Sequence, residues 1–275
     1  MAQSEPTSGW AQMAERYAAY AVAKNRPYAR QLVELAPPQQ GERVLDVATG
    51  PGVVAVEAAR AIPGLDVLAT DREAIWEPYV ARLAAEAGVG EIPFRAMPAE
   101  ALDLPDASFD LVYCEFGLMF VPDPVAALRE MRRVLRPGGR LAVAVWSGPE
   151  KVGHFAAMQA LQEALPGESE SDPAGFSPLR LGKPGLLRSM VEAAEFPSPI
   201  IVLFTEEYEI ADPEAEWVRL AAEPQTARRL AERTESERAE VRRRVLERLE
   251  RFRREGRIRV PSEAVIALAA RPASG

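Results

Sequence analysis

Short apolar runs alternate, in the first half of the chain, with segments whose apolar residues recur every three or four positions. The runs predict buried strands, because they are short and are bounded by Gly, Pro or charged residues. The segments between them have the period of amphipathic helices. This alternation predicts a parallel sheet covered by helices on both faces. The predicted strands are 43–48, 65–70, 92–96, 109–114 and 140–146.

Two helices are expected before this pattern, and a less regular region after it. Trp10, Met13, Tyr17 and Ala21 recur at helical spacing, and a second helix is expected over 27–35. After residue 146 the pattern predicts helices over 154–165 and 185–194, a Gly-, Ser- and Pro-rich mobile loop over 166–178, a strand over 200–208, a largely helical segment over 213–255 and a last strand over 264–270.

Together these elements predict an α/β fold. We expect a doubly wound, mostly parallel seven-stranded sheet of the Rossmann-like type, with a helical lid inserted before the last strand. The expected parts are a helical cap over 1–40, an α/β core over 41–165 that carries the binding site, and a remainder over 166–275 with the lid at about 209–256.

Composition narrows the classes of function. The net charge of −8 does not favour a surface that follows nucleic-acid phosphates. Cys114 is the one cysteine, which excludes a disulfide within the chain and fits a cytoplasmic protein. No stretch is long and apolar enough for a membrane span, and no signal peptide is expected. A homodimer is an oligomeric state that the sequence leaves open.

The segment 44–52, VLDVATGPG, is the strongest chemical signal. It ends the first strand and opens a helix, where glycines let the backbone approach a ligand. Its spacing matches neither the dinucleotide fingerprint nor a P-loop. Asp71 follows the second strand, where a carboxylate can accept hydrogen bonds from both ribose hydroxyls. The alternative for Asp71 is an ordinary N-cap before Glu73.

Four motifs in this order resemble those of class I S-adenosylmethionine-dependent methyltransferases. They are VLDVATGPG, LATDRE, SFDLVYCEFGLMFVPD and ALREMRRVLRPGGRLAVAVW. The likeness is closest to the small-molecule group that contains the ubiquinone and menaquinone C-methyltransferases, and it covers about residues 10–165. It implies S-adenosylmethionine as cofactor, no metal, a small-molecule acceptor, and methylation of carbon or oxygen.

The resemblance also implies the roles of individual residues. The first glycine-rich loop would surround the methionine part of the cofactor, the end of the second strand would hold the ribose and adenine, and the end of the fourth strand would face the sulfonium and the acceptor. The residues are Asp46, Ala48, Thr49, Gly50 and Gly52 for the first loop, Asp71 with Arg72 for ribose and adenine, Met97, Pro98 and Ala99 for the adenine pocket, Cys114, Glu115 and Phe116 for the reacting end, and Tyr20 with Trp10 and Tyr17 on a helix that closes over the cofactor.

Two positions depart from the family pattern. Ala48 stands where the family often has glycine. Pro98 stands where many members have an aspartate that binds the adenine amino group, so the Ala99 backbone and apolar walls would have to read the base. Methyl transfer from a sulfonium is mainly a matter of positioning, and a base is needed only if the acceptor loses a proton. Glu115 and His154 are the candidate catalytic residues.

Each candidate has a plainer alternative. His154, the one histidine, could be a helix-start or surface residue, Glu115 could orient the cofactor amino group, and Cys114 fits a small buried residue. The apolar cluster at 116–120 could contact an acceptor or belong to the core. Segment 235–259 is locally basic, but glutamate and arginine at i, i+4 with an apolar stripe favour a solvated helix over a nucleic-acid surface.

Two further functions stay open beside small-molecule methylation. One is methylation of RNA or protein, although the Cys-Glu-Phe-Gly that follows the fourth strand does not favour methylation of a base or amide nitrogen. The other is a non-catalytic protein that binds S-adenosylmethionine, because a fold does not fix a function.

Overall fold

The computed structural model describes residues 9–165, 177–222 and 224–273, with side chains from residue 14 onward in the first helix. The predicted loop at 166–178 therefore lies largely outside the described residues, as does the Trp10 side chain. The chain divides into two compact units. Unit 1 comprises Met1–Trp146, Asp172–Phe204 and Ala264–Gly275, and unit 2 comprises Ser147–Ser171 and Thr205–Glu263.

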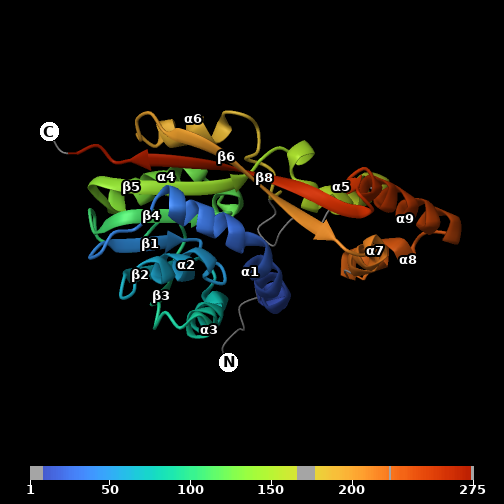
Figure 1. Ribbon diagram of the computed structural model, residues 1–275, viewed down its shortest axis with the longest axis horizontal. Coiled ribbons are helices and arrows are strands. Elements are labelled where there is room, and N and C mark those ends of the chain that lie inside the picture. Colours follow the sequence, from blue (N-terminus) through green and yellow to red (C-terminus); the bar gives the residue numbers. More distant parts are fainter. Residues whose placement is uncertain (1–8, 166–176, 223, 274–275) are drawn as a thin grey trace, which may run out of the picture. The chain divides into compact units, whose positions relative to one another are not determined.

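A mixed sheet of eight strands, counted over the described residues, has the order β3-β2-β1-β4-β5-β8-β6, with β7 paired to β8 (Figure 1). Strands β1 to β5 pair in parallel, and β5 pairs with β8 antiparallel. The strands are β1 Arg43–Val47, β2 Asp66–Asp71, β3 Phe94–Ala96, β4 Phe109–Glu115, β5 Leu135–Trp146, β6 Ile200–Ile210, β7 Arg253–Arg254 and β8 Arg257–Ala270. The predicted mostly parallel α/β sheet is confirmed, with β7 as an addition.

The order of the strands determines where a ligand can bind. The sheet runs outward from β1 in one direction through β2 and in the other through β4. Chain connections therefore leave in opposite directions at the carboxyl ends of β1 and β4. In open α/β sheets this switch point is the place where ligands bind.

Unit 1 contains five α-helices among its described residues, and short 3₁₀ turns follow β2 and β4. Helices α1 and α3 pack against α2, whereas α6 packs against α4. Asp123 caps α4 by accepting hydrogen bonds from the amides of Val125 and Ala126, at 3.1 and 3.0 Å. The elements are α1 Gly9–Leu35, α2 Val53–Ala61, η1 Ala74–Trp76, α3 Glu77–Ala87, η2 Leu118–Phe120, α4 Pro124–Val134 and α6 Leu186–Ala193.

One helix, α1, replaces the two that were predicted before the sheet. Pro27 lies inside it and supplies no backbone donor, which is why the sequence suggested a boundary there. Packing keeps the helix continuous, because Ala21 is 1% exposed before the proline and Tyr28 is fully buried after it. The hydroxyl of Tyr113 in β4 donates to the Ala36 carbonyl, which ties the end of this helix segment to the sheet.

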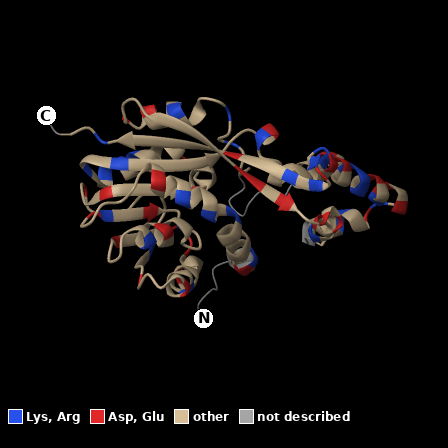
Figure 2. Cartoon of the chain, in the orientation of Figure 1, with Lys and Arg blue, Asp and Glu red and all other residues tan. Residues whose placement is uncertain are grey.

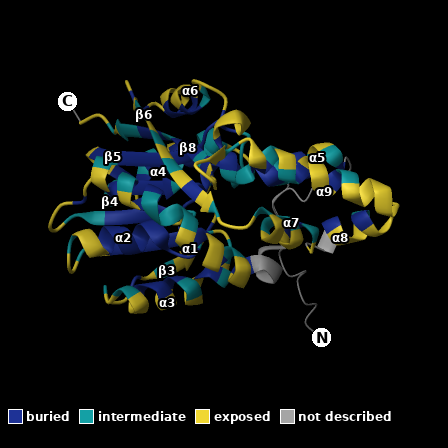
Figure 3. Cartoon of the chain, turned by 45° about the vertical axis from the view of Figure 1, so that its right-hand side comes forward, coloured by how far each residue is buried: buried dark blue, intermediate teal, exposed yellow. Residues whose placement is uncertain are grey.

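The core of unit 1 is formed by the central strands, which are dark blue in Figure 3. Leu45, Leu111 and Val112 are fully buried on β1 and β4. Their burial explains the continuous apolar runs, because a parallel strand with helices on both faces has no solvent side.

Unit 2 is built from short helices and the outer parts of β6 and β8. It contains η3 Pro149–Lys151, η4 Gly153–Phe155, α5 Ala156–Ala164, α7 Pro213–Ala221, α8 Pro224–Ala231 and α9 Glu235–Glu250. Thr234 and Glu237 form a capping box at the start of α9. Val241, Val245 and Leu249 are the buried stripe of α9.

The charged segment 235–259 is partly helix and partly strand. Figure 2 shows acidic and basic residues mixed along α9. Glu240 pairs with Arg243 at 2.7 Å and with Arg244 at 2.8 Å. The predicted helix to residue 255 is wrong at its end, because β7 and β8 form a hairpin there. Residues 257–266 alternate between exposed or half-buried and buried positions, and this period of two favours a strand.

Candidate functional site

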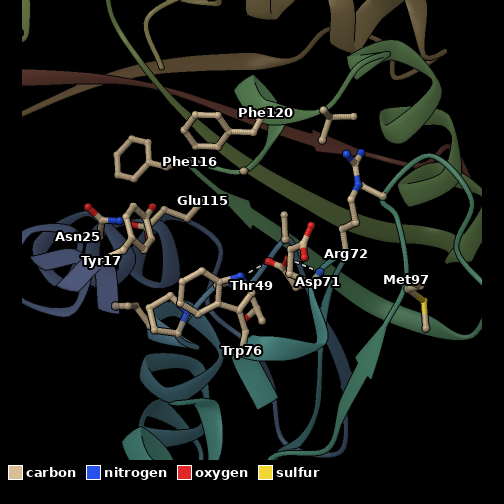
Figure 4. A pocket seen from close by; sticks show the side chains of 18 residues that line it. Tyr17, Asn25, Thr49, Asp71, Arg72, Trp76, Met97, Glu115, Phe116 and Phe120 are labelled. Carbon is tan, nitrogen blue, oxygen red and sulfur yellow. Dashed lines mark hydrogen bonds between the residues drawn. The ribbon is translucent and has the colours of Figure 1, made fainter. Parts of the chain in front are cut away.

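A cavity of about 220 Å³ lies in unit 1 at the carboxyl ends of β1, β2 and β4, at the switch point of the sheet (Figure 4). Residues from five places in the sequence meet there: helix α1, the loop after β1 with the start of α2, the end of β2 with η1, the segment after β3, and the end of β4 with η2. The lining residues are Tyr17, Asn25, Ala48, Thr49, Gly50, Pro51, Val53, Asp71, Arg72, Glu73, Trp76, Met97, Ala99, Glu115, Phe116, Gly117, Phe120 and Val121.

The loop after β1 has an unusual backbone. Ala48, Gly50 and Gly52 have φ values of 55°, 51° and 92°, a left-handed region that favours glycine. At Gly52 a Cβ atom would also meet Val80 at 3.1 Å. At Gly117, after β4, a Cβ atom would lie 2.4 Å from the Ala48 Cβ. The two loops therefore touch, and glycine at 117 permits this close approach.

Asp46 supports this loop from below. Its carboxylate is 1% exposed and accepts hydrogen bonds from the Thr49 hydroxyl at 2.6 Å and the Ala55 amide at 3.0 Å. Burial raises the pKa of Asp46 to about 7, which the hydrogen bonds partly oppose. Asp46 is not among the lining residues, so it fixes the loop that carries Ala48, Thr49 and Gly50 to the cavity.

Asp71, the last residue of β2, lines the cavity with its carboxylate. One oxygen accepts from the Gly50 amide at 2.9 Å and the other from the Glu73 amide at 3.1 Å. The hydrogen bond to Glu73 is the capping-type contact that the sequence left as an alternative, and it coexists with a place in the pocket. Burial raises the pKa of Asp71 to about 6.

Arg72, Met97 and Ala99 line the part of the cavity beside Asp71, whereas the Pro98 side chain is exposed and is not a lining residue. The Arg72 guanidinium lies 3.4 Å from Glu100. This part offers the apolar surface of Met97 and Ala99 beside the charged groups of Asp71, Arg72 and Glu73.

The end of β4 brings the third group of predicted residues. Glu115 and Phe116 line the cavity, while Cys114 is fully buried and burial raises the pKa of its thiol to about 12. The Glu115 Oε1 atom is buried and has no hydrogen-bond partner among the described residues. Burial, and then Asp46 and Glu57, raise the pKa of Glu115 well above its ordinary value.

Aromatic side chains form much of the remaining wall. The Phe116 ring stacks on Trp146 with centroids 3.7 Å apart, and the Tyr28 ring meets both edge-on. Tyr17 lies 5.7 Å from Trp76 between ring centroids. These contacts fix an apolar face on which a flat ring could lie.

Some lining residues were not predicted from the sequence. Asn25 lies two helical repeats of four after Tyr17, and this spacing could have indicated it. Trp76 and Phe120 come from 3₁₀ turns that carry no sequence signal of their own. Tyr20, which was predicted to bind the cofactor, is 41% exposed and is not a lining residue.

His154 lies in unit 2, in η4. Its Nδ1 atom is 2.7 Å from the Ser262 hydroxyl, and its ring centroid is 5.6 Å from that of Tyr208. The residues that line the unit 1 cavity do not include it.

Over the part of the chain that is described, no group of three or more His, Cys, Asp or Glu side chains could hold a metal ion. No described helix is long and apolar enough to cross a membrane.

Comparison with known proteins agrees with this geometry. A family model described as "Methyltransferase domain" matches residues 45–143. The ubiquinone/menaquinone biosynthesis C-methyltransferase of Pseudomonas putida is 39% identical over 127 residues, 46% of this chain and 50% of that enzyme, so the chain spans half the length of that relative. The demethylmenaquinone methyltransferase of Thermus thermophilus is 36% identical over 176 residues, 62% of this chain and 74% of that enzyme.

A solved structure from Bacillus halodurans matches with a TM-score of 0.61 at 22% identity, covering 89% of this chain and 98% of that chain, which shows a shared fold. The chain belongs to the S-adenosylmethionine-dependent methyltransferase family and has the class I fold, as the domain match, the match over 74% of the Thermus thermophilus enzyme and the order of the strands show.

Proposed function

We propose that the protein transfers a methyl group from S-adenosylmethionine to a small-molecule acceptor, at carbon or oxygen. The observation that carries this proposal is the cavity at the switch point, because it joins the glycine-rich loop, the Asp71 carboxylate and an aromatic wall in one site. The names of the two relatives concern quinone methylation, which supports an acceptor with a ring.

The residues present fit the cofactor. Asp71 retains lone pairs for the ribose hydroxyls, and Met97 and Ala99 offer an apolar surface to the adenine. The open backbone at Gly50, where even a Cβ atom would meet nothing within 4 Å, leaves room for the methionine part. The exposed Pro98 takes no part, so the base would be read by the Ala99 backbone and by shape.

The chemistry needs few catalytic side chains. S-adenosylmethionine supplies an activated methyl group, and the protein contributes mainly by holding the acceptor in line with it. Phe116, Phe120 and Tyr17 would orient a ring and exclude water. Glu115 is the proton-accepting group that the pocket itself offers, whereas a role for His154 would require unit 2 to take part. The helical segment at about 209–256 is proposed as the lid that selects the acceptor.

Ligand binding tests the proposal directly. Thermal unfolding is measured with and without S-adenosylhomocysteine, with NAD as the control. At about 100 times the dissociation constant the ligand should stabilise the protein by roughly 2.7 kcal/mol. That is a rise in Tm of about 5–10 °C for a chain of this size. Asp71→Asn should weaken this shift, because one charged acceptor for the ribose is lost.

A shift with S-adenosylhomocysteine and none with NAD supports the proposed cofactor. Methyl transfer from labelled S-adenosylmethionine to a panel of phenols and quinols then separates an enzyme from a protein that only binds the cofactor. If the cofactor binds and the panel, an RNA pool and a protein pool all stay unlabelled, the non-catalytic alternative replaces the proposal.

A further inference from the structure

Three carboxyl groups, those of the buried Asp46 and the half-buried Asp71 and Glu115, lie at the floor and wall of the cavity, and they are not equivalent. Asp46 accepts hydrogen bonds from Thr49 and Ala55, and both oxygens of Asp71 accept from backbone amides. The Glu115 Oε1 atom is buried but has no hydrogen-bond partner among the described residues. A buried polar atom without a partner is costly, so its hydrogen-bonding capacity is available to a ligand.

The charged groups nearest to Glu115 are acids. Asp46 approaches from β1 and Glu57 from α2, and both disfavour a second negative charge at Glu115. Glu57 forms ion pairs with two arginines of α1, because Arg26 and Arg30 each lie 3.2 Å from one of its oxygens. Arg60, on the same helix as Glu57, lies 3.5 Å from it.

The other sides of the cavity bring no spare positive charge to Glu115. Helix α1 presents the uncharged Tyr17 and Asn25, which Figure 4 shows on the same side of the pocket as Glu115. The segment after β2 presents Asp71 and Glu73, together with an arginine that is paired elsewhere, Arg72 with Glu100 at 3.4 Å. Among the described lining residues Arg72 is the one cation and is paired with Glu100, so a positively charged ligand would bring Glu115 a cation that is not already paired.

We propose that Glu115 distinguishes the charged sulfonium cofactor from its uncharged thioether product through one proton, which the carboxyl group releases to solvent when the cation binds and regains from solvent when the product replaces it. The inference rests on the proposed cofactor. S-adenosylmethionine carries one more positive charge than S-adenosylhomocysteine, and the two are otherwise alike in the groups that titrate. The only bond that breaks in this exchange is the O–H bond of Glu115.

The proposed proton release determines how the affinity for each ligand depends on pH. Burial favours the protonated form of Glu115 and raises its pKa, whereas a neighbouring positive charge favours its ionised form. Binding of the sulfonium therefore becomes tighter as pH rises, by up to about tenfold per pH unit, until the carboxyl group of the free protein has itself ionised. Binding of the thioether product lacks this gain. The dissociation constant of S-adenosylhomocysteine divided by that of S-adenosylmethionine therefore grows with pH.

The experiment is titration calorimetry of the full chain with S-adenosylmethionine and, separately, with S-adenosylhomocysteine. Both are measured between about pH 5.5 and 8.5, in two buffers of different ionisation enthalpy, which gives the proton released per ligand. Wild type should release more protons with the sulfonium than with the thioether. Glu115→Gln, which keeps the size of the side chain, should remove most of this difference and make the ratio of dissociation constants less dependent on pH.

Glu73→Gln is the matched control, because Glu73 also lines the cavity and undergoes the same substitution. It should keep the wild-type difference between the two ligands. Equal proton release by both ligands in wild type, or an unchanged pH dependence of the ratio in Glu115→Gln, would overturn the inference alone. Failure of both ligands to bind wild type would overturn the proposed function, and the inference with it.

Discussion

The contact between the two loops that form the cavity floor can be tested by exchanging their side chains. Gly117→Ala would place a methyl group 2.4 Å from the Ala48 Cβ, and 3.3 Å from both the Ala48 carbonyl oxygen and the Cys114 sulfur. Neither partner is the mobile end of a long side chain, so the loops would have to separate. Overpacking of this kind costs about 1–3 kcal/mol.

Ala48→Gly removes the methyl group with which the new one collides. Ala48 has a φ of 55°, so glycine at this position also relieves backbone strain in the folded state. This gain about balances the stability lost because glycine raises the conformational entropy of the unfolded chain. We expect Ala48→Gly alone to change the free energy of unfolding by less than about 1 kcal/mol. The double variant Ala48→Gly/Gly117→Ala should recover most of the stability that Gly117→Ala loses, so the coupling energy is about 1–3 kcal/mol.

Urea denaturation followed by circular dichroism measures the four proteins, and the affinity for S-adenosylhomocysteine reports the shape of the floor. The control is Gly148→Ala, where the atoms nearest to the added methyl group belong to the carboxylate end of Glu150, the closest at 2.6 Å, and that side chain can move. Gly117→Ala should lower Tm by about 3–10 °C. Wild-type stability in Gly117→Ala, or losses that simply add in the double variant, would refute the proposed contact.

Two further predictions concern the residues that shape the site. Gly52→Ala should destabilise the protein more than Gly90→Ala, by about 1 kcal/mol in urea denaturation, because both glycines have positive φ but only Gly52 would place a Cβ against Val80. Since burial raises the pKa of Asp46 to about 7, ionisation favours unfolding, and stability should fall as pH rises from about 4 to 7. Asp46→Asn should reduce that fall in pH-dependent unfolding, and an identical fall would contradict the assignment.

The central strands could be predicted because a strand that is buried on both faces is a continuous apolar run, and amphipathic helices rarely contain such a run. Leu45, Leu111 and Val112 are fully buried, and their runs are visible without any structure. The beginning of β8 was missed because its first half has one polar face and follows a long charged helix. There the buried Ile258 and Val260 alternate with exposed arginines. This period of two extends over few residues, whereas the helical pattern that precedes it is long.

Some residues of the candidate site could likewise be predicted from the sequence, and others could not. Asp71 and Gly50 could be predicted, because the ends of parallel strands and the loops after them meet at one edge of the sheet. Trp76 and Phe120 could not, because their place in the pocket depends on how the 3₁₀ turns after β2 and β4 pack at the cavity. No local pattern encodes such packing, which is a property of the assembled domain.

The three carboxyl groups explain how one small cavity can hold a scaffold and still respond to its ligand. Asp46 and Asp71 take their hydrogen bonds from the loop after β1 and from the turn after β2, so their oxygens keep the floor in place whether or not a ligand is bound. The Glu115 Oε1 atom takes none from the described chain, so no hydrogen bond of the scaffold is made through this atom. A group whose protonation can change without moving the backbone is suited to follow the charge of a ligand, and this is the physical reason to assign that role to Glu115 and not to either aspartate.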